Sequence, residues 1–224
     1  MSKRFLFLTL AVLAAGCGSS SQQPTTTTVP VPVSPSPMSL TVFRVENGSL
    51  HAESVEVPAT QAVARAALGA LGLGADVTID AGTAHVQLDK ATDAQVAEIV
   101  YTLTQFSSVQ RVDVAGRTGL TRADVAAFVP PILVEKPASG ATVPETFTIS
   151  GTASVFEATL VVEVRRAGKV LSRQTVTASE GAPARGSFSA TVHALGGSVT
   201  LAVYSPSAAD GSHQHEQDLE LKVR

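Results

Sequence analysis

The stretch 92–114 constrains the fold more than any other part of the chain. Its apolar residues recur at helical spacing and form one continuous stripe, made of Val96, Ile99, Val100, Leu103 and Phe106. Polar Glu98, Thr102 and Gln105 lie on the opposite side of the predicted helix. Residues 109–114 then alternate as in a strand. An amphipathic helix that leads into a strand needs a sheet to bury its stripe, so the sequence predicts helices packed on a sheet.

Two hairpins and a further helix precede this stretch. Residues 39–57 form a predicted hairpin around the Asn-Gly pair at 47–48, a strong signal for a two-residue turn. A helix capped by Thr60 follows, and residues 76–88 form a second predicted hairpin. The predicted order is ββαββαβ over residues 39–118, an α+β domain with two helices on one face of a sheet.

Two further helix starts carry the pattern of a capping box. Thr92 is followed three residues later by Gln95, at the start of the amphipathic helix. Thr121 is followed in the same way by Asp124, which predicts a short helix inside a linker at 119–130.

The rest of the chain, residues 131–224, alternates in short runs separated by glycine-containing turns. Such regular spacing predicts an all-β, immunoglobulin-like sandwich. The chain has one cysteine and no tryptophan, which excludes the disulfide and tryptophan core of antibody domains. The predicted strands are 132–136, 144–153, 158–166, 169–178, 185–193, 197–205 and 217–223.

The N-terminus has the pattern of a targeting signal. Lys3 and Arg4 precede the apolar run Phe5–Ala15. As a helix this run is about 16 Å long, well short of a hydrocarbon core of about 30 Å. Residues 13–17, Leu-Ala-Ala-Gly-Cys, resemble a bacterial lipobox, which implies that Cys17 is acylated after cleavage.

The sequence therefore predicts a lipoprotein signal peptide at 1–16, with membrane attachment through lipid on Cys17. Residues 17–38 are rich in Ser, Thr and Pro, and we expect them to act as a spacer. The expected location is the outer face of the bacterial cytoplasmic membrane.

Two resemblances follow from these segments. Residues 84–91 (AHVQLDKA) and 100–116 (VYTLTQFSSVQRVDVAG) resemble the GerMN domain of sporulation and spore-germination proteins. Family members usually have a longer segment where this chain has LGLGADVTID at 71–80. Residues 132–143 and 149–164 resemble the immunoglobulin-like domain of bacterial spore germination, the Gmad family. Together they imply association with envelope proteins and assign no catalytic residue; self-association is left open.

Composition excludes several functions. The formal net charge is −3 and aromatic residues make up 4% of the chain, so neither a basic surface nor a stacking platform for nucleic acid is expected. The same scarcity of aromatic residues argues against an aromatic-lined sugar groove.

One cluster has the chemistry of metal ligands. His213, His215 and Glu216, with Asp210 and Asp218 nearby, contain a His-x-His pattern that an extended segment places on one face. The cluster also fits a solvated turn before the last strand, which we favour. We therefore expect no metal and no cofactor.

The remaining candidates have simpler interpretations. His85 is expected to be a structural strand histidine, and Glu157 a solvent-facing or backbone-capping carboxylate. Arg165 and Arg166 are placed at a hairpin tip, where they solubilise the protein or bind an anionic wall polymer. No nucleophile elbow, phosphate-binding loop or Cys–His pair is present in the sequence, so we expect no enzyme activity.

Three hypotheses for function result. The first is a non-enzymatic surface lipoprotein that binds envelope proteins through the edge strands of the sandwich and the exposed face of the 92–106 helix. The second is a module that binds cell-wall polysaccharide, with peptidoglycan as the obvious polymer. The third, which we favour least, is a metal-dependent enzyme that uses the 210–218 cluster.

Overall fold

The asparagine and glycine of the first predicted turn join two long strands. In the computed structural model, which describes residues 36–224, strands β1 (Pro37–Glu46) and β2 (Ser49–Pro58) pair antiparallel along their whole length. Asn47 and Gly48 have φ angles of 51° and 79°, as a tight turn with two left-handed residues requires. The predicted hairpin is confirmed. The predicted signal peptide, Cys17 and the spacer up to residue 35 lie outside the described residues.

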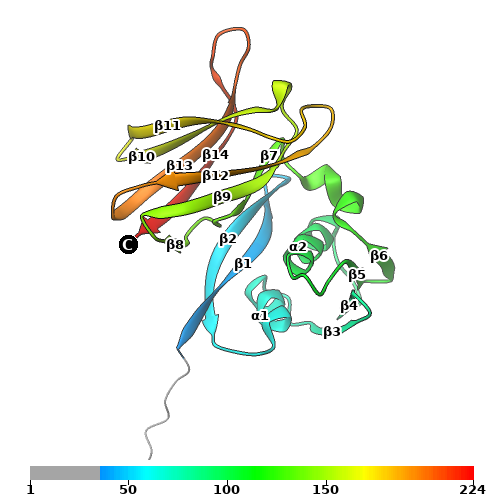
Figure 1. Cartoon of the computed structure of the whole chain (residues 1–224). Helices are drawn as coiled ribbons and strands as arrows, with labels where there is room; N and C mark the ends of the chain where they lie inside the picture. Colours follow the sequence, from blue (N-terminus) through cyan, green and yellow to red (C-terminus); the bar gives the residue numbers. More distant parts are fainter. Residues whose placement is uncertain (1–35) are drawn as a thin grey trace, which may run out of the picture. The chain divides into compact units, whose positions relative to one another are not determined.

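The next elements follow the predicted order but do not form one sheet. The strands after β2 make a four-stranded sheet in the order β3-β4-β5-β6, separate from the two-stranded β1–β2 sheet (Figure 1). The single sheet of our prediction is therefore wrong, and β6 extends beyond residue 118, the predicted end of the domain. The elements are α1 (Val63–Ala70), β3 (Asp76–Asp80), β4 (Thr83–Gln87), α2 (Asp93–Thr104), β5 (Arg111–Val114) and β6 (Arg117–Leu120).

Helix α2 explains why the two sheets stay apart. Its polar side chains bind the main chain of β1 along the strand's outer edge. Thr102 Oγ1 accepts a hydrogen bond from the N–H of Phe43 at 2.9 Å, and Glu98 Oε1 accepts one from the N–H of Val45 at 2.8 Å. Gln105 Nε2 donates to a further β1 carbonyl, that of Thr41, at 2.8 Å. A strand whose edge is occupied in this way has no free main-chain groups there for another strand.

The helix starts agree with the sequence in two cases of three. Thr92 and Gln95 form the predicted capping box of α2. Thr121 does the same with Asp124 at the start of η1 (Arg122–Phe128), although η1 is a kinked 3₁₀ helix. Thr60 does not cap α1, because its hydroxyl accepts from the N–H of Ala62 at 3.0 Å, before the helix begins.

Residues 132–223 form the predicted sandwich, with one sheet ordered β11-β10-β13-β14-β8 and the other β12-β9-β7. All seven predicted strands are present, and the prediction missed the short strand β8 and the 3₁₀ turn η2 (Phe156–Ala158). The strands are β7 (Ile132–Lys136), β8 (Thr142–Val143), β9 (Thr146–Ala153), β10 (Thr159–Arg166), β11 (Lys169–Thr177), β12 (Gly186–His193), β13 (Gly197–Pro206) and β14 (His213–Val223).

Residues 36–224 contain two hydrophobic cores, and the first includes residues of the segment that starts the sandwich. We call residues 37–129 the first lobe. Its core includes Leu133 and Ala138, which belong to the segment that starts the sandwich. Beside them, Ser139 exchanges two main-chain hydrogen bonds with β2, accepting from Ser54 at 2.7 Å and donating to Ala52 at 2.9 Å. The first lobe and the sandwich therefore form one compact unit.

Candidate functional site

The histidine-rich segment does not form the geometry of a metal site. His213 and His215 lie in β14, which begins four residues earlier than predicted, and not in a turn. A register shift interrupts the pairing of β13 with β14 here, and His215 has a φ of 56°. The two rings therefore do not follow the regular alternation that places i and i+2 on one face. In residues 36–224 no group of three or more His, Cys, Asp or Glu side chains is arranged to hold a metal ion.

The side chains of this segment instead bind their neighbours on the outer face of the five-stranded sheet. The ring of His213 stacks on Tyr204, with 3.5 Å between the ring centroids. Its Nδ1 lies 3.0 Å from Glu216 Oε2. Glu216 in turn accepts a hydrogen bond from Arg165 at 2.6 Å.

Glu163 is the centre of this arrangement, and sequence analysis missed it. The carboxylate is buried, with 1% of its side chain exposed. Oε1 accepts from Arg173 Nε at 2.6 Å and from the Tyr204 hydroxyl at 2.9 Å, and Oε2 accepts from Arg165 Nε at 2.7 Å. One signal was available: the run Val-Val-Glu-Val-Arg places Glu163 and Arg165 two residues apart on the same face of a strand.

The electrostatics show that these groups are held as charged pairs. Burial acts to raise the pKa of Glu163, but the hydrogen bonds from Arg165, Arg173 and Tyr204 outweigh it and lower this pKa below its usual value. The pKa of Glu216 is lowered in the same way, because hydrogen bonds from His213 and Arg165 outweigh its burial. Burial, followed by the hydrogen bond to Glu163, raises the pKa of Tyr204.

The two arginines expected at a hairpin tip are engaged within the protein. Arg165 binds Glu163 and Glu216, as described above. Arg166 donates from Nη2 to the carbonyls of Leu195 at 2.7 Å and Gly196 at 3.0 Å. Both residues are part of β10. Most of their donors join strands and turns, although Arg166 Nε has no hydrogen-bond partner among the described residues. Binding of an anionic polymer by this pair stays a hypothesis.

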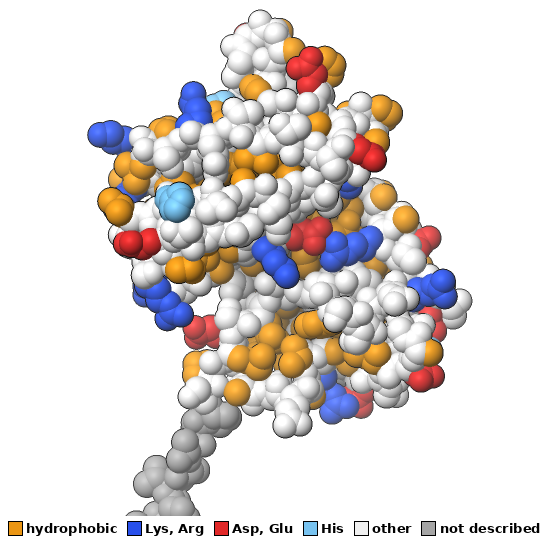
Figure 2. All heavy atoms as spheres, viewed as in Figure 1, with side chains coloured by type: hydrophobic (Ala, Val, Ile, Leu, Met, Phe, Trp, Pro, Cys, Tyr) orange, Lys and Arg blue, Asp and Glu red, His pale blue; other side chains and the backbone are white. Residues whose placement is uncertain are grey.

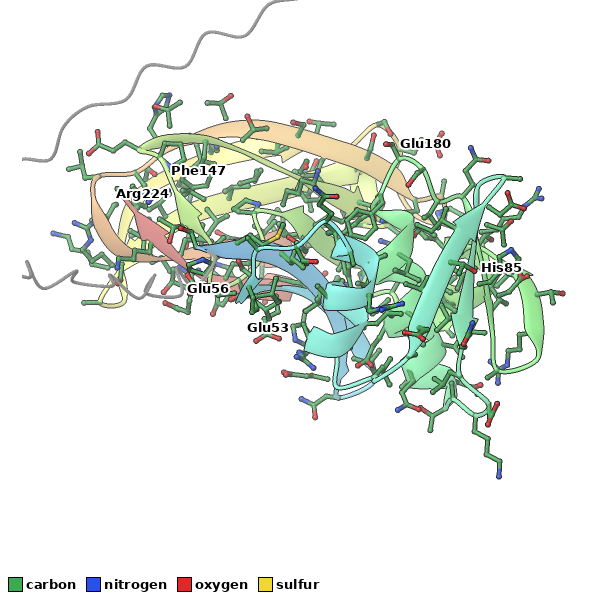
Figure 3. The ribbon with its side chains drawn as sticks, turned by 90° about the horizontal axis from the view of Figure 1, so that it is seen from below. Glu53, Glu56, His85, Phe147, Glu180 and Arg224 are labelled. Carbon is green, nitrogen blue, oxygen red and sulfur yellow. The ribbon has the colours of Figure 1, made fainter. Side chains whose placement is uncertain are left out.

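His85 has an acidic partner that the sequence spacing did not indicate. β4 and β5 are parallel neighbours, and their register places His85 beside Asp113. His85 Nδ1 lies 3.0 Å from Asp113 Oδ2, while Asp113 Oδ1 accepts from the N–H of Gly119 at 2.6 Å. In Figure 3 His85 lies in the first lobe, at the opposite end of the view from Phe147 of the sandwich. The pair joins neighbouring strands, as the structural interpretation of His85 predicts.

Glu157 is exposed, and its neighbour Phe156 is 66% exposed. Glu157 and Ala158 both have positive φ angles, 52° and 54°, which are unfavourable for residues other than glycine. The expectation that Glu157 faces solvent is confirmed.

The expected contact surface on the helix does not exist. Of the twelve residues of α2, only Asp93 is exposed, and Thr102 is completely buried. The prediction was wrong because the polar residues opposite the apolar stripe face the main chain of β1, not solvent. The edge strands of the sandwich fit the prediction better. β11 pairs only with β10, and its Val170 and Leu171 are 42% and 47% exposed.

A second surface of the sandwich is polar and carries no acidic or basic side chain of β9 or β12 other than His193. The outer faces of β9 and β12 carry hydroxyl side chains in matched pairs, and Figure 2 shows a broad band without charged side chains there. One end of the band holds a histidine, His193, whose Nδ1 lies 2.8 Å from Thr146 Oγ1. The pairs are Thr146 with His193, Thr148 with Thr191, Ser150 with Ser189, and Thr152 with Ser187. We call these eight residues the hydroxyl ladder.

Comparison with known families agrees with the sandwich. Residues 131–212 match the family described as the immunoglobulin-like domain of bacterial spore germination, Gmad2. The match covers β7 to β13 and stops one residue before β14. No curated protein matches the chain. Within residues 36–224, none of the helices has the length and apolar character needed to cross a membrane.

Proposed function

We propose that this chain is a non-enzymatic lipoprotein that binds other proteins of the bacterial cell envelope. In this proposal lipid on Cys17 holds it at the outer face of the cytoplasmic membrane, and residues 36–224 carry the binding surfaces. The match of the sandwich to a spore-germination family supports this function, as does the resemblance of residues 39–118 to the GerMN domain.

The observation that carries the proposal is the free edge of β11. A terminal strand presents main-chain donors and acceptors to another chain, and exposed Val170 and Leu171 add apolar area beside them. The charged groups of the neighbouring sheet face, by contrast, are paired with one another through Glu163. They support the fold and leave the edge as the surface for contact.

Cross-linking in intact cells, followed by purification of the tagged chain, tests the proposal. We expect specific envelope proteins to be recovered, and their recovery to fall when Val170 and Leu171 are both changed to Glu. Leu195→Glu is the matched control, because Leu195 is 70% exposed but lies in the turn between β12 and β13. Recovery of no specific partner from intact envelopes would overturn the proposal.

The anchor needs its own test. Cys17→Ser removes the thiol that would be acylated, so we expect the protein to move from the membrane fraction to the soluble fraction. If the variant stays in the membrane fraction after a salt wash, Cys17 is not the anchor.

The hydroxyl ladder favours a second candidate function, binding of neutral cell-wall polysaccharide. Its hydroxyls donate and accept hydrogen bonds, as sugar hydroxyls do, and Arg185 reaches the ladder at one end, where Nη1 donates to Thr152 Oγ1 at 3.2 Å. Sedimentation of the Cys17→Ser protein with purified wall sacculi tests this function. Thr148→Glu with Thr191→Glu should abolish co-sedimentation if the ladder binds, and absence of co-sedimentation by the parent protein rejects it.

A further inference from the structure

Strand β3 is a terminal strand of the four-stranded sheet and pairs only with β4. Four of its five residues are exposed, and Val77 is half-buried. Ile79 is 44% exposed. The outer edge of β3 therefore offers main-chain groups together with apolar side chains.

An apolar groove lies directly beside this edge. It has a volume of about 440 Å³ and runs between the start of α1 and β3. Val77 and Ile79 line it from β3, since they point to the same face of the strand, and Val63 lines it from α1. Phe106, just after α2, completes the apolar lining, and the polar lining includes Arg65, the ion-pair partner of Asp76. Apolar side chains are also visible on this face of the first lobe in Figure 2.

The edge and the groove suit one kind of ligand, an extended segment. A strand added antiparallel to β3 would pair with its main chain and direct every second side chain into the groove. Main-chain pairing supplies affinity, and the groove selects apolar side chains at alternate positions. The β3 edge and the groove would each bind only weakly alone, but both contact the same extended segment.

Charge decides between a second copy of this chain and a different partner. β3 has Asp76 and Asp80 at its two ends. Asp76 pairs with Arg65 at 3.0 Å, whereas Asp80 has no ion-pair partner within the described part of the chain. If β3 paired antiparallel with its own copy about Thr78, each Asp76 would lie opposite an Asp80 of the other copy. Like charges directly opposite one another are destabilising, so self-pairing is disfavoured.

We propose that β3 and the start of α1 form a binding edge for an extended segment of another protein, with the pattern basic–apolar–any–apolar–basic. Its central residue lies opposite Thr78, its apolar residues enter the groove beside Val77 and Ile79, and its basic residues face Asp76 and Asp80. This edge belongs to the first lobe and does not depend on the β11 edge or on the Cys17 anchor.

A synthetic peptide tests the proposal directly. The probe is a fluorescent nonapeptide with the core Lys-Val-Thr-Val-Lys, and the control peptide has Glu in place of both Lys. Fluorescence anisotropy with the full chain in detergent should give saturable binding of the Lys peptide and weaker binding of the Glu peptide.

Variants of the protein locate the binding edge. Ile79→Lys should weaken binding of the Lys peptide about tenfold by removing apolar contact. Asp80→Lys should weaken the Lys peptide about fivefold and strengthen the Glu peptide. Val170→Lys, on the β11 edge, is the matched control and should leave both affinities unchanged. Far-UV circular dichroism shows whether each variant is folded.

Three results would overturn the proposal. The first is that the Lys peptide shows no saturable binding. The second is that folded Ile79→Lys and Asp80→Lys bind the Lys peptide with the same affinity as the parent protein. The third is a concentration-dependent dimer of the parent protein that the Ile79→Lys substitution dissociates. The last would assign the edge to a second copy. Failure of these peptide experiments leaves the cross-linking result at β11 unaffected, so the two proposals fail separately.

Discussion

Two regions of this protein bury polar side chains, and they satisfy them differently. In the first lobe, Thr102 and Glu98 of α2 accept hydrogen bonds from main-chain N–H groups of β1. In the sandwich, Glu163 accepts hydrogen bonds from Arg165, Arg173 and Tyr204, so side chains satisfy side chains. The first arrangement closes the edge of a strand, and the second neutralises charge on the face of a sheet.

The two arrangements predict different losses of unfolding free energy when a buried polar side chain is removed. Loss of a side chain from α2 leaves one neutral main-chain group of β1 unpaired, which costs about 1–3 kcal/mol when that group is buried. Loss of the Glu163 carboxylate removes the shared partner of Arg165, which is 19% exposed and keeps Glu216, and of Arg173, which is 60% exposed; the cost falls mainly on the less exposed charge. Ranked by size, the following experiments test this contrast.

Neutralising Glu163 should have the largest effect. Glu163→Gln keeps the shape of the side chain but removes its charge, and we expect the free energy of unfolding to fall by about 3 kcal/mol. Urea denaturation followed by circular dichroism measures the change. Glu157→Gln makes the same chemical change at an exposed site and should alter stability by less than about 0.5 kcal/mol. Equal effects of the two variants would show that the buried carboxylate has no special role.

Removing the hydroxyl of Thr102 should have the next largest effect. Thr102→Val has nearly the same shape but leaves the buried N–H of Phe43 without an acceptor, so we expect a loss of about 2 kcal/mol. Thr102→Ser keeps the hydroxyl and loses only a methyl group, at a cost of about 1 kcal/mol. If Ser is as destabilising as Val in urea denaturation, packing of the methyl group dominates and the closed strand edge matters little.

Acidification should weaken the sandwich cluster and leave the hydrogen bond from Phe43 to Thr102 unchanged. The pKa of Glu163 is lowered in the folded protein, so the unfolded chain takes up the proton first as the pH falls. Its contribution to stability is fully present above the unfolded value near 4.5 and is lost as the pH falls through the folded pKa. Urea denaturation at several pH values below 5 should show a smaller loss for Glu163→Gln than for the parent protein. Parallel curves for the two proteins would contradict this.

Neutralising Asp218 should have the smallest effect and the opposite sign. Burial and the charge of Glu216 raise the pKa of Asp218, so folding destabilises its ionised form relative to the unfolded chain. Asp218→Asn removes that charge, and we expect a gain of a few tenths of a kcal/mol, roughly, for this partly exposed group. A loss of stability would mean that the 3.7 Å contact of Asp218 with Arg165 outweighs the repulsion.

Local signals predicted the elements well and their partners poorly. The Asn-Gly pair at 47–48 and the Thr92 capping box determine local geometry, and both are present as predicted. Alternation also located the seven strands of the sandwich, because the apolar–polar pattern of a strand involves only residues close together in the sequence.

The wrong or missing predictions concern contacts between residues that are far apart in the sequence. The Thr102 side chain and the Phe43 N–H are 59 residues apart, and no periodicity distinguishes a polar residue that faces water from one that faces a strand edge. The hydrogen bonds to Glu163 join three strands, and only its Arg165 partner lies within two residues. His85 lies beside Asp113 because β4 and β5 pair in parallel, and the sequences of the two strands do not specify this pairing.

The position of Leu133 shows that the sandwich depends on the first lobe to keep one of its apolar side chains buried. The matched segment starts at residue 131, yet the side chain of Leu133 belongs to the core of the preceding lobe. A protein that carried this segment beside a different neighbour, or beside none, would expose that leucine to water. The sandwich cut away from the first lobe would therefore carry an apolar patch that lowers its solubility.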